Sequence, residues 1–157
     1  MSEISDAIQA KCLAFGDRVI KLNDYLLQQA SLPKSDGGSQ KADKRGKTQT
    51  SYVRHQTCRI PVHLQAIATL CNQLLRSGTS IGANNAEATN AVSKTDYRSK
   101  SYIALKEARE SLFWIELLHR NNYIDDKQYS SIYGDCEELV KILVARCKKL
   151  DQELGGK

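Results

Sequence analysis

Side chains that commonly carry catalysis are few in this sequence and stand apart from one another. It contains three histidines, His55, His63 and His119. None belongs to an H-E-x-x-H motif or to the Glu-x-x-His pair that builds di-iron sites in helical bundles, and no nucleotide-binding glycine loop is present. Glu107 and Glu110 have helical spacing, but Lys106 and Arg109 interleave them, as on a solvated helix face. Since catalysis needs several convergent polar groups, the sequence predicts a protein that is not an enzyme and uses no metal or cofactor.

The cysteines indicate neither a metal site nor a disulfide framework. Their number is odd, no C-x-x-C pair occurs, and four of the five fall within helical apolar patterns, which favours buried, reduced thiols. The five are Cys12, Cys58, Cys71, Cys136 and Cys147. No N-terminal segment joins a basic region to an apolar run, and no apolar stretch approaches the roughly 18 residues of a membrane span. We therefore expect a soluble, cytoplasmic protein with no membrane partner.

Basic side chains are the one chemical feature that the sequence concentrates. The net charge is +5, and residues 31–59 hold seven basic residues against two acidic ones, so this segment accounts for the whole excess. The segment is rich in Ser, Gly, Lys, Gln and Thr and poor in aliphatic residues, so it cannot bury enough surface to offset its ordering entropy. We predict a disordered basic insertion at residues 31–57. The candidate phosphate-binding residues in and beside it are Lys34, Lys41, Lys44, Arg45, Lys47, Arg54 and Arg59.

A second group of cations occurs further along the chain. Its members are Lys94, Arg98, Lys100, Arg146, Lys148 and Lys149. Clustered lysine and arginine attract the phosphates of RNA or DNA without reading sequence, and no interleaved aromatic platform for stacking bases accompanies them. Any binding should therefore recognise backbone and shape. A charge run is often only a solvated face, so the alternative is a protein–protein scaffold that binds no nucleic acid.

Apolar periodicity divides the chain into four long helices, which must position these side chains. Only two prolines occur and glycines are few, which favours helices over many short strands. The first helix is predicted over about residues 5–29, and the second from a cap at Thr57 with Pro61 tolerated in its first turn. Short links make the second, third and fourth helices antiparallel neighbours. The predicted fold is all-α: one domain, residues 1–157, forming an antiparallel up-and-down four-helix bundle with the basic insertion between its first two helices.

Capping signals place the third and fourth helices. The third is predicted to follow a cap at Thr95 and to reach about His119. The fourth opens at Asp125, with Gln128 placed for a capping box, and continues to the glycines at 155 and 156. Its end is predicted to be basic and to complement the helix dipole. The cations concerned are Arg146, Lys148 and Lys149.

Small residues recur every four positions in the second helix, at Gly78, Gly82 and Ala86. Two glycines inside a helix cost about 1 kcal/mol each relative to alanine, so another interaction must favour them. A close crossing with a neighbouring helix is the leading interpretation. A kink or a close approach to a ligand would also fit this pattern.

Two motifs stand on the second and third helices. The first reads QLLRSGTSIGAN at residues 73–84, followed by Glu87 and Ala88; the second comprises Asp96-Tyr97, SYIALKEARE at 101–110 and WIELL at 114–118. Together they resemble the signature of the 23S ribosomal RNA intervening-sequence protein family, over about residues 60–120. The sequence departs from the family pattern in its basic insertion and at Asn85, where members usually carry an aliphatic residue.

The resemblance implies an antiparallel four-helix bundle that tends to form ring-shaped homopentamers. It also implies kinship with the accessory variability protein of diversity-generating retroelements, a basic pentamer that binds nucleic acid and a reverse transcriptase. Apolar residues off the core stripe of the third helix independently predict a homo-oligomer, because such a flank needs a partner surface. They are Ile103, Phe113, Trp114 and Leu117. The predicted function is therefore that of a non-enzymatic, oligomeric nucleic-acid-binding accessory protein.

Overall fold

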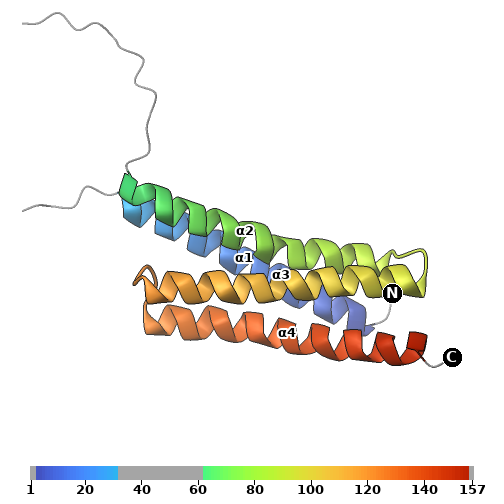
Figure 1. Ribbon diagram of the computed structural model, residues 1–157. Helices are drawn as coiled ribbons and strands as arrows, with labels where there is room; N and C mark the ends of the chain where they lie inside the picture. The colour runs from blue at the N-terminus through green and yellow to red at the C-terminus, as the bar shows by residue number, and fades with distance from the viewer. Residues whose placement is uncertain (1–2, 32–61, 156–157) are drawn as a thin grey trace, which may run out of the picture.

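Four antiparallel α-helices and no strand make up residues 3–31 and 62–155, which the computed structural model describes. The helices are α1 (Glu3–Ser31), α2 (Val62–Thr89), α3 (Lys94–Arg120) and α4 (Asp126–Gly155). They alternate in direction and lie side by side (Figure 1). The predicted all-α antiparallel four-helix bundle is confirmed. None of the four described helices has the length and apolarity to cross a membrane.

The predicted insertion lies outside the described residues except for Ser31, which is the last residue of α1. The cap and proline predicted for the second helix and the seven cations of the segment also lie outside them. These are Thr57 and Pro61, with Lys34, Lys41, Lys44, Arg45, Lys47, Arg54 and Arg59. The two helix ends to which the segment is joined, at α1 and at α2, meet at the same end of the bundle (Figure 1).

The cap of α3 is two residues earlier than predicted. Ser93 has an extended backbone, and its hydroxyl oxygen accepts a hydrogen bond from the Asp96 amide at 3.1 Å. Thr95 instead lies exposed within the first helical turn, so the prediction of Thr95 as the cap was wrong. Serine and threonine give the same capping signal, and the residue at which the chain leaves the extended conformation becomes the cap. The helix ends at Arg120 with Asn121 as its C-cap, and Asn122 follows with a positive φ of 57°, a conformation that asparagine tolerates.

The N-terminus of α4 carries the predicted capping box. The Asp125 amide donates to Oε1 of Gln128 at 3.0 Å, and the Gln128 amide donates to Oδ1 of Asp125 at 2.7 Å. The C-terminal prediction was wrong, because the last turn of α4 contains no basic residue. Arg146, Lys148 and Lys149 lie too far from the end of the helix to complement its dipole, an effect limited to the last turn.

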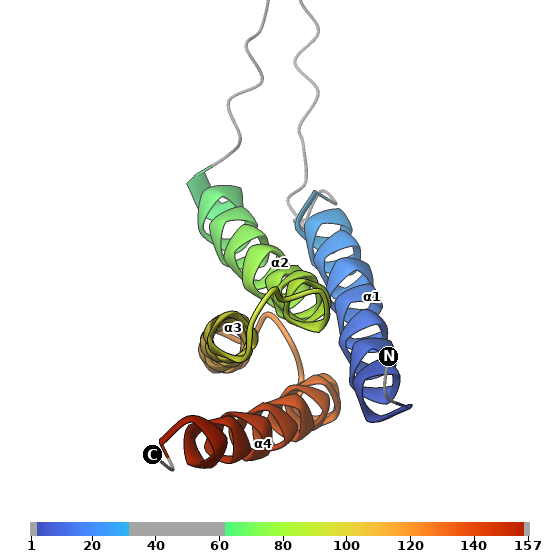
Figure 2. The same ribbon diagram turned by 90° about the vertical axis from the view of Figure 1, so that its right-hand side faces the viewer.

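The core follows the predicted apolar stripes. Residues spaced by three and four positions in each helix meet at the bundle axis, and Phe15, Ile81, Ile115 and Leu143 are all at most 2% exposed. Viewed end-on, α4 runs obliquely past α3, so that its C-terminal end lies away from the start of α1 (Figure 2). Ion pairs of Lys11 with Glu138 and of Arg18 with Asp135 join the middle of α1 to the first half of α4.

The small-residue stripe of α2 packs closely against α1. A Cβ atom added at Gly78 would lie 3.1 Å from Cγ2 of Val19 and 3.4 Å from the Phe15 ring. One added at Gly82 would lie 3.4 Å from Cβ of Cys12. Ala86 is half-buried further along. The two glycines therefore stand where α1 and α2 approach each other closely, as a close helix crossing requires.

Candidate functional site

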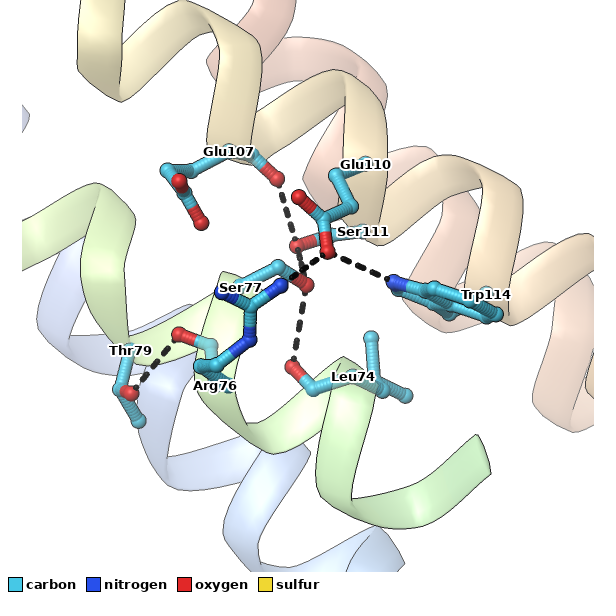
Figure 3. Close-up of polar contacts among 8 residues, drawn as sticks. All are labelled: Leu74, Arg76, Ser77, Thr79, Glu107, Glu110, Ser111 and Trp114. Carbon is cyan, nitrogen blue, oxygen red and sulfur yellow. Dashed lines mark hydrogen bonds and ion pairs between the residues drawn. The ribbon is translucent and has the colours of Figure 1, made fainter. Parts of the chain in front are cut away.

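The motif residues of α2 and α3 face each other across a buried hydroxyl pair. The hydroxyl of Ser111 donates to the hydroxyl oxygen of Ser77 at 2.9 Å, and both residues are fully buried (Figure 3). The same Ser111 oxygen lies 2.9 Å from the carbonyl oxygen of Glu107, and the Ser77 hydroxyl lies 3.4 Å from that of Leu74. Both hydroxyls thus have partners, which is the condition for placing polar groups in a core.

An ion pair covers this hydroxyl pair at the surface. Nη2 of Arg76 lies 2.7 Å from Oε1 of Glu110, and the same oxygen accepts a hydrogen bond from the Trp114 indole at 3.1 Å (Figure 3). Arg76 is largely exposed, so this pair contributes little to stability by itself. Its geometric effect is to hold the indole ring of Trp114 beside the exposed ring of Phe113, whose centroid is 4.9 Å away.

Glu107 is a carboxylate of the motif with an unmade hydrogen bond. Its Oε2 atom is buried and has no hydrogen-bond partner among the described residues. Burial, and then the nearby charge of Glu110, raise the pKa of Glu107, while Arg76 opposes the shift. No group of three or more His, Cys, Asp or Glu among the described side chains, those of residues 5–31 and 64–155, could hold a metal ion.

Three of the predicted phosphate-binding cations are already neutralised by acidic residues. Lys94 pairs with Glu153 at 3.2 Å, Arg98 with Asp151 at 2.6 Å, and Lys100 with Glu87. Tyr102 also donates to Asp151 at 2.6 Å, and these two hydrogen bonds lower the pKa of the Asp151 carboxyl. These three cations therefore act first as links between helices. No local pattern indicated their partners, which lie up to 59 residues away in the chain.

The other three cations occupy one turn of α4. Arg146 is half-buried, and Lys148 and Lys149 are exposed. Among the described side chains, those of residues 5–31 and 64–155, no acidic group forms an ion pair with any of the three. Arg146 instead donates from Nη1 to Oδ1 of the fully buried Asn85 at 2.6 Å, and its guanidinium lies 5.6 Å from the centre of the Tyr97 ring. The sequence marked Asn85 only as a departure from the family pattern, and its contact with Arg146 was not predicted.

The cations of α4 stand far from the end of the bundle where α1 stops and α2 starts (Figure 1). Arg146 bonds to Asn85, which lies 23 residues along α2 from Val62, or roughly 35 Å at 1.5 Å per residue. The other predicted group of cations lies outside the described residues.

The predicted oligomer-forming residues form an exposed apolar patch on α3. Phe113 is 55% exposed and Ile103 is 37% exposed, whereas Trp114 and Leu117 are half-buried. All four lie on α3, and their role in an intermolecular contact stays a prediction.

The fold and the buried polar contact between α2 and α3 define an antiparallel four-helix-bundle protein. The family model described as "23S rRNA-intervening sequence protein" matches residues 51–145, and the chain belongs to that family. A solved structure from Bacteroides thetaiotaomicron VPI-5482, described as a protein of unknown function from the S23 ribosomal protein family, is 33% identical with a TM-score of 0.66. The alignment covers 92% of this chain and 97% of that one. No curated protein matches the sequence.

Proposed function

We propose that this protein is a non-enzymatic, homo-oligomeric accessory protein that binds RNA or DNA through the phosphate backbone. One observation carries the proposal: Arg146, Lys148 and Lys149 gather in one turn of α4 with no acidic partner among the described side chains, those of residues 5–31 and 64–155. Cations that lack a counter-charge attract phosphate, and each contact releases counterions from the nucleic acid. The ribosomal RNA in the name of the family makes RNA the first ligand to test.

The basic composition of residues 31–59 supports the same function. In a ring of identical subunits each cation cluster would be repeated, which strengthens the attraction for a polyanion. Assistance to a reverse transcriptase rests only on the kinship that the sequence resemblance implies. A reverse-transcriptase gene with template and variable repeats beside this gene would support that role. A position within a ribosomal RNA gene would instead favour the intervening-sequence role.

Fluorescence anisotropy with a labelled RNA oligonucleotide, at two salt concentrations, tests the proposal. Changing Lys148 and Lys149 together to Gln should weaken binding of unrelated sequences by similar factors. Removal of one phosphate contact should reduce the slope of log K against log salt by roughly 0.7 to 0.9. The matched control is the double change of Lys106 and Arg109 to Gln, which removes two exposed cations from the middle of α3.

A second variant, with Lys41, Lys44, Arg45 and Lys47 all changed to Gln, measures the contribution of the basic segment. If only this variant binds RNA more weakly, the basic segment carries the binding. If the Lys148 and Lys149 variant also binds more weakly, the cations of α4 contribute as well. Wild-type affinity that does not depend on salt would contradict the electrostatic proposal. The absence of any retained RNA or DNA would leave the scaffold alternative, which the exposed Phe113 favours.

A further inference from the structure

A pocket of about 630 Å³ opens at the end of the bundle where α1 begins. Its volume lies within the range of about 300–1,000 Å³ that is usual for small-molecule sites. The ion pair of Lys11 with Glu138 sets the antiparallel register of α1 and α4, so the first turns of α1 lie opposite the turns of α4 that hold Arg146 and Leu150. α4 continues past the described start of α1 as far as Gly155.

The floor and walls of the pocket are mainly apolar. Ile8 of α1 and Ile142 and Leu150 of α4 supply aliphatic surface, and Tyr97 of α3 supplies an aromatic ring. Ile8 and Leu150 are themselves buried in the bundle and are therefore held in place. An occupant must consequently present a hydrocarbon body to these side chains, since burying polar groups against them without partners would cost free energy.

The cations at this pocket are not balanced by acids. Lys94, Arg146 and Lys149 line it, and among the described side chains Glu153 is the one acidic lining residue, already paired with Lys94 at 3.2 Å. This leaves Arg146 and Lys149 without a counter-charge among the side chains of residues 5–31 and 64–155. A half-buried cation is normally paired, because desolvation is otherwise uncompensated.

The guanidinium of Arg146 is held in position rather than free in solvent. Asn85, with no exposed surface, accepts from Nη1 at 2.6 Å and donates from Nδ2 to Oε1 of Gln9 at 2.5 Å. The Tyr97 ring stands on another side of the guanidinium, 5.6 Å from Cζ. The Nη2 and Nε atoms make no hydrogen bond to the described side chains, those of residues 5–31 and 64–155, so they can donate together to an anionic group.

We propose that this pocket binds a small organic anion with an apolar body, such as a medium-chain carboxylate. The anionic head would lie between Arg146 and Lys149, and the hydrocarbon would lie against Ile8, Ile142 and Leu150. The pocket shares Arg146 and Lys149 with the proposed nucleic-acid surface but takes a different ligand, because an exposed phosphodiester backbone has no apolar body to place against the aliphatic walls. The buried amide of Asn85 fixes the position of Arg146, and Arg146 has no acidic partner among the described side chains. This fixed, unpaired cation favours an anionic ligand over a neutral one.

Isothermal titration calorimetry of the full chain with decanoate, and with decanol as the uncharged ligand of the same length, tests the site. Decanoate should bind saturably, and decanol should bind at least about tenfold more weakly. Arg146→Met should weaken decanoate binding at least about tenfold, since it removes a charge-assisted contact. The matched control Lys148→Met removes a neighbouring exposed cation that does not line the pocket, and it should bind decanoate like the wild type.

A second variant covers the case in which Arg146→Met does not fold. Ala145 is exposed and lines the pocket, so Ala145→Trp fills the pocket without altering the core and should abolish binding. Equal binding of decanol and decanoate, or unchanged binding by Ala145→Trp, would overturn the proposal. The proposal would also be overturned if RNA displaced decanoate and failed to bind the Ala145→Trp variant, because the pocket would then bind phosphate. A protein that binds decanoate but no RNA contradicts only the nucleic-acid function.

Discussion

Asn85 has no exposed surface within α2, and it accepts a hydrogen bond at 2.6 Å from Arg146, which lies 61 residues later on α4. Its amide nitrogen donates to Gln9 of α1, so this one side chain joins three helices. A buried amide costs free energy unless its hydrogen bonds are made, and here both ends of the amide are satisfied. The contact therefore fixes how α4 stands against α1 and α2 at the end of the bundle where the pocket opens.

Breaking this contact from either side should have non-additive effects. Asn85→Ala should destabilise the protein by about 1–3 kcal/mol, because Arg146 and Gln9 both lose their partner. Arg146→Met leaves a buried carbonyl oxygen unpaired and should also destabilise it. In urea unfolding, the double variant should cost at least about 0.5 kcal/mol less than the sum of the two single changes. Additive costs would show that the two side chains do not interact.

Features that depend on residues close together in the sequence were predicted, whereas contacts between residues far apart in the sequence were not. The capping box of Asp125 and Gln128 was found because its two members stand three residues apart in a fixed geometry. The contact between Asn85 and Arg146 has no such signal, since a polar residue in an apolar stripe does not indicate its partner. For the same reason, Arg98 was named as a phosphate-binding residue although Asp151 neutralises it in the fold.

The two glycines Gly78 and Gly134 should respond oppositely to alanine. An added Cβ at Gly134 meets nothing within 4 Å, so Gly134→Ala should stabilise the protein by about 0.5–1 kcal/mol through helix propensity. At Gly78 the same Cβ would lie 3.1 Å from the buried Val19 side chain. Overpacking there should cost about 1–3 kcal/mol and outweigh the gain in propensity. Urea unfolding of both variants measures the difference, and equal stabilisation by the two changes would contradict the close packing of α1 on α2.

The N-cap of α3 can be identified by a similar pair of variants. Ser93→Ala should destabilise the protein by about 1 kcal/mol, because the Asp96 amide loses its acceptor. Thr95→Ala should change the stability by less than about 0.5 kcal/mol, since this exposed side chain lies within the helix. Thermal unfolding followed by circular dichroism compares them. A larger destabilisation by Thr95→Ala than by Ser93→Ala would mean that Thr95 is the N-cap, as the sequence predicted.

Tyr129 should make the stability depend on pH in the alkaline range. Its hydroxyl donates to Oε2 of Glu116 at 2.7 Å, and this hydrogen bond, followed by burial, raises the pKa of Tyr129 to about 12. The unfolded chain releases the same proton near its ordinary pKa of about 10. The native state therefore binds the proton more tightly, and its stabilising effect is full below about pH 10 and is lost as the pH rises through about 12.

Comparison with Tyr129→Phe isolates this effect, because other groups titrate in both proteins. The free energy of unfolding of the wild type should exceed that of the variant by a larger margin at about pH 9 than at about pH 11.5. Urea unfolding at the two pH values provides the measurement. A margin that stays constant or grows with pH would mean that the hydrogen bond to Glu116 does not hold the phenol proton.

The exposed apolar patch of α3 should carry self-association. Phe113 is 55% exposed and stands edge-on to Trp114, an arrangement that offers a rigid aromatic surface to a second copy of the chain. Static light scattering of the wild type at micromolar concentration should give the mass of an oligomer, with a pentamer as the state that the family resemblance predicts. Phe113→Asp should shift this mass toward the monomer, because a carboxylate in an apolar interface is desolvated without a partner. Helicity by circular dichroism should persist, since Phe113 contributes little to the core.

Val92→Asp is the matched control for this change. Val92 is 94% exposed in the turn between α2 and α3, so the same substitution alters charge and apolar surface outside the patch and should leave the mass unchanged. Trp114 is the only tryptophan of the sequence, so its emission reports on the patch directly and should shift to the red when Phe113→Asp dissociates the oligomer. A wild-type monomer would contradict self-association altogether. A Phe113→Asp oligomer of unchanged mass and emission would place the subunit contact on another surface, where exposed Leu13 and Ile20 of α1 are the next residues to test.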